Sequence, residues 1–81
     1  MTLFLDGSLY ATPRELHEAL KRLLSLPDYY GMNADALHDC LSERTDLPNL
    51  YIACDGNEEV ARALQLVGRV VEDLGGTVRH A

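Results

Sequence analysis

Apolar residues along the chain switch between short continuous runs and helical spacing, and this pattern predicts a series of strands and helices. Residues 2–5 form a mainly apolar run that Asp6-Gly7 ends, which indicates a strand followed by a turn. Thr12, Pro13 and Glu15 together are typical of a helix start. The helix is expected to end near Leu26, because Pro27 disfavours helical geometry in the residue before it. Its predicted apolar face comprises Leu16, Ala19, Leu20, Leu23 and Leu24.

The rest of the chain predicts two further helices and two further strands. After a loop over residues 27–32, Asn33 is expected to cap a second helix that runs to about Glu43. Residues 50–54 read as a strand that is apolar on both faces, as in a buried parallel sheet. Asn57 is expected to cap a third helix, Gly75-Gly76 to end it, and residues 77–79 to form a short last strand. The core face of the third helix comprises Val60, Leu64, Val67, Val71 and Leu74.

The order strand, helix, helix, strand, helix, strand predicts an α/β fold in which a small three-stranded parallel sheet packs with three main helices. Right-handed helical crossovers would connect the strands, and we expect the first strand at the centre of the sheet. With 81 residues, the chain has room for a single domain over residues 1–81 and no deep cavity for a cofactor, so none is expected.

Several simple features bear on location. No stretch approaches the roughly 18 apolar residues of a membrane span, and the first residues do not read as a signal peptide. Cys40 and Cys54 fit no metal or redox spacing. We therefore expect both cysteines to be reduced and the protein to be cytoplasmic.

The distribution of charge indicates the class of partner more directly than the overall composition does. The net charge of −6 disfavours direct binding to nucleic acid or to anionic lipid and favours a basic partner. Between Asp28 and Asp46 there are five acidic residues and one basic residue, Arg44, which gives a local charge of −4. Most of the excess negative charge is therefore concentrated in the second helix and its flanks.

In that helix, acidic and apolar residues occupy opposite sides. At helical spacing Ala34, Leu37 and Leu41 face the core, and Asp35, Asp39 and Glu43 form a row on the far side. Like charges four residues apart cost roughly 0.2–0.5 kcal/mol per pair, so the row is unfavourable for the helix itself. His38 lies at the boundary of the two sides. Cys40 flanks the apolar side as a small core residue.

More than one interpretation fits these residues. An acidic row is often only a solvated surface, and of the adjacent Tyr29 and Tyr30 one is expected to be buried and one exposed. Asp35, His38 and Asp39 could also bind a divalent metal in a hydrolase. However, the chain has no H-E-x-x-H, glycine-rich phosphate loop or G-x-S-x-G motif, and His17 and His80 have no obvious partners, so we expect no catalytic activity and no metal.

The stretch from Leu26 to Leu41, L-P-D-Y-Y-G-M-N-A-D-A-L-H-D-C-L, resembles the barstar family of intracellular ribonuclease inhibitors. The resemblance covers most of residues 1–54 well and residues 55–81 in outline. It implies that the second helix and the loop before it block the active site of a ribonuclease. Tyr29 would stack on a catalytic imidazole, and Asp39 would take the place of the substrate phosphate. The implied ribonuclease-binding residues are Tyr29, Gly31, Asn33, Asp35, His38, Asp39 and Glu43.

The chain also departs from the family pattern. His38 stands where the family's best-known member has a large aromatic residue, and Met32 replaces an acid in the loop. The segment after the second strand is too short for a further small helix of the family. A late acidic contact on the last helix has no clear counterpart, since Val70 falls near it and Glu72 and Asp73 are the nearest acids.

These departures affect the identity of the target more than the fold. The target implied is a microbial ribonuclease, or a ribonuclease toxin against which the chain would act as an immunity protein, and the free chain is expected to be a monomer. The alternative from the charge pattern is an acidic adaptor or regulatory module with a basic partner that is not a ribonuclease.

Overall fold

The computed structural model describes residues 1–80 and has the predicted order of helices and strands. It is an α/β fold in which three α-helices pack with a three-stranded parallel sheet, as expected. The link between the second strand and the last α-helix, residues 54–57, contains no additional helix, also as expected. The elements are β1 (Thr2–Asp6), the short 3-10 helix η1 (Gly7–Leu9), α1 (Pro13–Leu23), α2 (Ala34–Ser42), β2 (Asn49–Ala53), α3 (Glu58–Asp73) and β3 (Thr77–His80).

The three α-helices begin at the predicted caps. The side-chain oxygens of Thr12, Asn33 and Asn57 each accept a hydrogen bond from the backbone N–H three residues later. Each cap satisfies one of the N–H groups that the first turn of a helix leaves without a partner. The helix starts that position the loop and α2 are thus set by local sequence.

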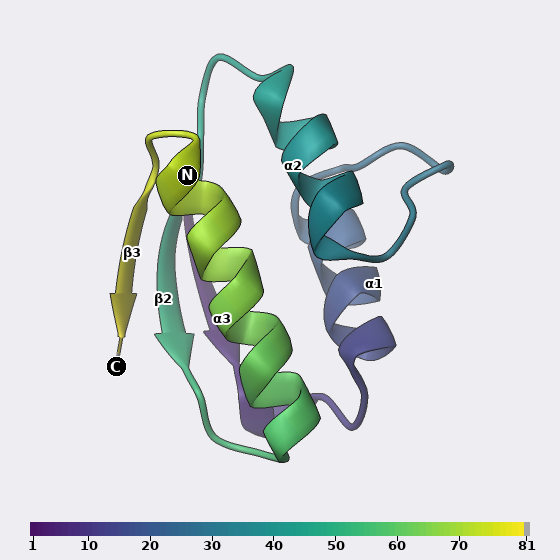
Figure 1. Cartoon of the computed structure of the whole chain (residues 1–81), viewed down its shortest axis with the longest axis vertical. Helices are drawn as coiled ribbons and strands as arrows, with labels where there is room; N and C mark the ends of the chain where they lie inside the picture. Colours follow the sequence, from purple (N-terminus) through teal and green to yellow (C-terminus); the bar gives the residue numbers. More distant parts are fainter. Residues whose placement is uncertain (81) are drawn as a thin grey trace.

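The order of strands in the sheet is β1-β2-β3, so β2 lies at the centre and the expectation of a central first strand is wrong. Figure 1 shows the strands gathered on one side of the molecule and the helices on the other. Right-handed crossovers that move across a sheet in one direction place their helices on one face, whereas a central first strand would divide them between two faces. The strand order therefore leaves the other face of the sheet bare.

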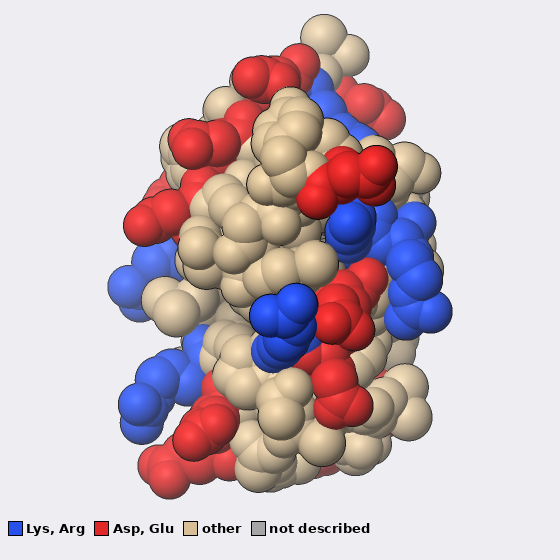
Figure 2. Space-filling model, turned by 90° about the vertical axis from the view of Figure 1, so that its right-hand side faces the viewer, with Lys and Arg blue, Asp and Glu red and all other residues tan. Residues whose placement is uncertain are grey.

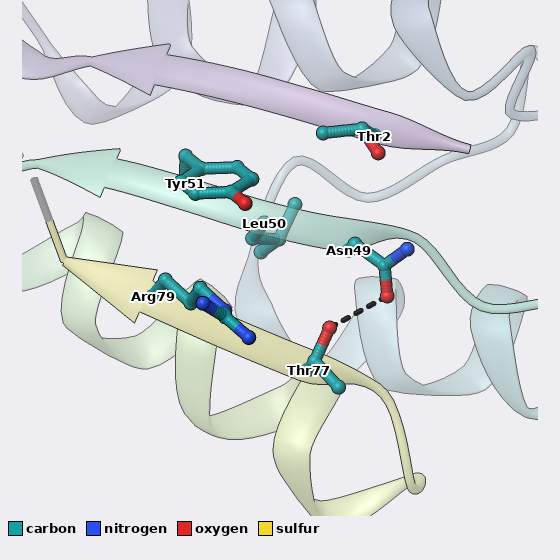
Figure 3. A pocket seen from close by; sticks show the side chains of 6 residues that line it. All are labelled: Thr2, Asn49, Leu50, Tyr51, Thr77 and Arg79. Atoms are coloured by element: carbon teal, nitrogen blue, oxygen red, sulfur yellow. Dashed lines mark hydrogen bonds between the residues drawn. The ribbon is translucent and has the colours of Figure 1, made fainter.

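The bare face corrects a second expectation, that the residues of β2 are buried on both sides. Leu50 and Ile52 are buried, but Tyr51 between them is 38% exposed. Figure 3 shows Tyr51 and Arg79 on the bare face. Asn49 and Thr77 lie on the same face, and the Thr77 hydroxyl donates a 2.6 Å hydrogen bond to Oδ1 of Asn49. Tyrosine is compatible with either environment, so the sequence pattern alone does not distinguish a bare face from a covered one.

The core lies between the covered face of the sheet and the three helices. Most of the predicted core positions are buried, but Leu23 is 46% exposed and that expectation is wrong. α1 ends at Leu23, and on either side of the turn at Ser25 the inward positions are taken by Leu24 and Leu26. None of the helices in the described part of the chain is long and apolar enough to cross a membrane.

Candidate functional site

The loop between α1 and α2 presents one tyrosine to solvent and buries the other. Tyr29 is 81% exposed, whereas Tyr30 is 4% exposed. The expectation that the two adjacent rings separate in this way is confirmed. The Tyr30 hydroxyl lies 2.6 Å from Nδ1 of His17 and 3.4 Å from the carbonyl oxygen of Asn33, to which it donates. The buried ring therefore anchors the loop to α1 and to the start of α2.

The partner of Tyr30 was not expected from the sequence. His17 is buried on α1, and burial lowers the pKa of its imidazole, so the folded protein favours the neutral ring. Burial raises the pKa of the Tyr30 hydroxyl, which therefore stays protonated. The sequence feature that indicates burial of His17 is its position directly after Leu16 and three residues before Leu20, both of which are core residues.

The acidic row of α2 faces solvent. Asp35, Asp39 and Glu43 are all exposed. The ion pairs within residues 1–80 join Arg14 to Glu18 and Lys21 to Asp28, so the row has no basic partner in this part of the chain. Figure 2 shows the face formed by α1, α2 and their loop, with acidic side chains gathered over its upper left.

Arg44, the one basic residue between Asp28 and Asp46, is engaged elsewhere. Its guanidinium donates a hydrogen bond to the carbonyl oxygen of Leu24, at the C-terminal cap of α1. A cation is favoured there because the C-terminal end of a helix carries partial negative charge. The charge of Arg44 thus ties α2 to α1 and leaves the acidic row without an ion pair.

A hollow of about 330 Å³ separates the exposed tyrosine from the C-terminal half of α2, and Tyr29, Cys40 and Glu43 are among its lining residues. Cys40 is half-buried and packs against the core, as expected of a small core residue. Burial raises the pKa of its thiol, and the carboxylates of Glu43 and Asp39 raise it further, against an opposing effect of Arg44. The thiol is therefore suited to packing and not to nucleophilic chemistry.

The remaining predicted site residues lie on the same loop and helix. Gly31, Asn33 and His38 are all exposed. Besides capping α2, the Asn33 side chain donates a 3.1 Å hydrogen bond to the carbonyl oxygen of Gly31, which fixes the last residues of the loop. All seven predicted residues are thus exposed on one loop–helix segment. By contrast, Val70 on α3 is buried.

The metal alternative has no support in the described part of the chain, because residues 1–80 contain no group of three histidine, cysteine, aspartate or glutamate side chains that could hold an ion. What the segment offers is an exposed aromatic ring and a row of carboxylates without basic partners.

The sequence is similar to those of known proteins. A sequence model of the family described as "Barstar (barnase inhibitor)" matches residues 1–75. A Bacillus subtilis (strain 168) protein named "Putative ribonuclease inhibitor YrdF" is 48% identical over 46 residues, which are 57% of this chain and 50% of that protein. The match therefore spans about half the length of this curated relative.

Proposed function

The chain belongs to the barstar family, and from this membership we propose that it is a proteinaceous ribonuclease inhibitor and not an enzyme. In this proposal it blocks the active site of a microbial ribonuclease, or of a ribonuclease toxin, with α2 and the loop before it. We call the contact residues the docking surface. They are Tyr29, Gly31, Asn33, Asp35, His38, Asp39 and Glu43.

The proposed mechanism is mimicry of RNA phosphate. An enzyme that cleaves RNA concentrates positive charge where the phosphate sits and where negative charge develops during the reaction. Asp39 stands in the middle of the acidic row and would occupy the phosphate site, with Asp35 meeting a neighbouring basic group. Tyr29, which is 81% exposed, has a free ring that would stack on a catalytic imidazole. A carboxylate in the phosphate position has no bond that the enzyme can cut.

One observation carries the proposal: the three carboxylates of the row are exposed and have no ion pair within residues 1–80. Binding to a basic site therefore does not require that internal ion pairs be broken first. It would also relieve the repulsion between carboxylates four residues apart, because cationic groups of the enzyme would lie between them.

Further parts of the proposal concern the context of action. Residues 1–81 act as one domain, monomeric when free, without contact to nucleic acid or membrane. The domain acts in the cytoplasm, where it protects cellular RNA either from an enzyme that the same cell makes or, as an immunity protein, from a toxin that enters.

The test is inhibition of purified ribonucleases. The chain is titrated into barnase, other bacterial ribonucleases and ribonuclease domains of toxins, and cleavage of a fluorogenic RNA substrate is followed. We expect at least one of these enzymes to be inhibited at one-to-one stoichiometry in competition with substrate. An absence of inhibition across the panel, together with capture of a basic protein that is not a ribonuclease, would contradict the proposal and favour an acidic adaptor.

A further inference from the structure

A second hollow lies beside the docking surface and is lined by residues of α1, of α3 and of the start of α2. Its volume is about 460 Å³, within the range of roughly 300–1,000 Å³ typical of binding pockets. It is open to solvent. We call this hollow the apolar socket, after Met32, Ala34, Ala63 and Leu66 in its lining.

The chemistry of the socket differs from that of the docking surface. Leu66 is 46% exposed, so an apolar side chain is presented to water at this point. Glu59 and Arg62 bring one charge of each sign, so the socket has no net charge to attract phosphate or a metal ion. His17 also lines it, but Nδ1 of that ring is already engaged by Tyr30. A largely uncharged, apolar group is therefore the occupant that the lining fits best.

The socket is continuous with the docking surface. Asn33 belongs to both, since it lines the socket and caps the helix that carries the acidic row. Met32 and Ala34 flank it, and Asp35 follows directly on the exposed side of α2. A protein that contacts Asn33 and Asp35 therefore reaches the mouth of the socket without any change in the backbone of this chain.

The composition of the docking surface indicates what the socket would contribute. Of its seven residues, Tyr29 alone brings a large apolar area, and the others are glycine, polar or charged. Specific interfaces have a desolvated apolar centre in addition to charged groups, which mainly accelerate association. The docking surface as predicted from the sequence lacks a second apolar anchor, and the socket beside it offers one.

We propose that the apolar socket receives an aliphatic or aromatic side chain from the ribonuclease bound at the docking surface. The inference rests on the proposed function and adds a second contact region, in which Leu66 and Ala63 on α3 determine how long the complex lasts. Charge complementarity at the acidic row would set the rate of association, and burial in the socket would slow dissociation.

The test compares two substitutions on neighbouring residues of α3. Leu66→Arg places a charge at the socket, and Gln65→Arg makes the same change of net charge at an exposed residue outside it. Both are measured against the ribonuclease that the chain inhibits most tightly, by stopped-flow association and by dissociation after dilution. We expect Leu66→Arg to raise the dissociation rate constant by about tenfold or more and Gln65→Arg to change it by less than about twofold. Thermal unfolding of both variants verifies that the fold is retained.

The outcomes separate this inference from the proposed function. Equal dissociation rates for the two variants would overturn the role of the socket, while loss of inhibition by Asp39→Asn in the same assay would leave the proposed function intact. Full inhibition by Asp39→Asn would instead overturn the proposed function, on which the socket depends. A small-to-intermediate effect of Leu66→Ala in the same direction as Leu66→Arg would support burial, since that variant removes apolar area without adding charge.

Discussion

Nδ1 of His17 lies 2.6 Å from the hydroxyl oxygen of Tyr30, and this buried contact joins α1 to the loop that presents Tyr29. The same hydroxyl donates to the carbonyl oxygen of Asn33, the cap of α2. A single side chain thus connects both helices that border the docking surface. Leaving a buried polar atom without its partner costs more free energy than the hydrogen bond itself contributes. Loss of this pair should therefore lower the free energy of unfolding measurably.

Tyr30→Phe removes the hydroxyl and leaves the imidazole of His17 without its partner. We expect the free energy of unfolding to fall by about 1–3 kcal/mol, measured by urea denaturation at neutral pH. Tyr29→Phe is the matched control, since its ring is 81% exposed. A surface substitution of this kind should change stability by less than about 0.5 kcal/mol, and equal effects of the two variants would contradict the anchoring role of Tyr30.

The lowered pKa of His17 predicts a pH dependence of stability. The unfolded chain takes up a proton near pH 6.5, whereas burial holds the folded pKa below that value. The unfolded state therefore binds more protons as the pH falls below about 6.5, and stability is lost in that direction. Urea denaturation of the protein and of His17→Phe between about pH 7.5 and 5 should show a shallower slope for the variant. His80→Gln, at an exposed site on β3, should retain the original slope.

Asp39→Asn should separate function from folding. Inhibition is expected to weaken by at least about 100-fold, because removal of one partner from a buried ion pair costs roughly 3–5 kcal/mol. Stability of the free protein should stay the same or rise slightly, since each like-charge pair at this spacing costs only about 0.2–0.5 kcal/mol. Asp55→Asn, an exposed acid in the link between β2 and α3, makes the same charge change away from the docking surface and should inhibit normally.

Association with the ribonuclease should slow as salt is added. The acidic row would attract a basic active site over distances that salt screens, with a Debye length of about 10 Å at roughly 0.1 M. Between about 0.05 and 0.5 M sodium chloride we expect the association rate constant to fall by about tenfold or more, with a smaller change in dissociation. An association rate that does not depend on salt would argue against docking through the acidic row.

The two cysteines should react with thiol reagents at different rates. Cys54 is exposed, whereas Cys40 is half-buried and its thiol pKa is raised by burial and by the carboxylates of Glu43 and Asp39. A chromogenic disulfide at neutral pH should therefore modify one thiol fast and one slowly. In Cys54→Ser only the slow phase should remain. Persistence of the fast phase in that variant would contradict the environment assigned to Cys40.

Local features of the fold were predictable from sequence because they depend on neighbouring residues. Thr12, Asn33 and Asn57 cap the helices as predicted, since a cap requires only a suitable side chain three residues before a free N–H. The central position of β2 was not predictable in this way. The direction of the crossovers decides which strands pair. The sequence of a short apolar strand does not identify the strands that lie beside it in the sheet.

The same distinction applies to the candidate site. Exposure of the acidic row followed from helical periodicity, and so did the burial of Leu37 and Leu41 behind it. The contact between His17 and Tyr30 joins residues 13 positions apart, and the apolar socket combines residues from three helices. Neither has a signature within one segment, and both become visible only when the helices are placed against each other.

Because Arg44 is bound at the end of α1, it does not compensate the repulsion between the carboxylates of the acidic row, and this matters for attempts to stabilise the protein. A library selected for heat resistance would favour lysine or arginine at position 39, since a cation there lies four residues from both Asp35 and Glu43 and converts repulsion along α2 into attraction. If the acidic row binds the enzyme, those variants would be more robust and yet inactive. Selection for thermal stability alone would therefore remove the binding of the partner, which is the usual trade-off between stability and function at a binding surface.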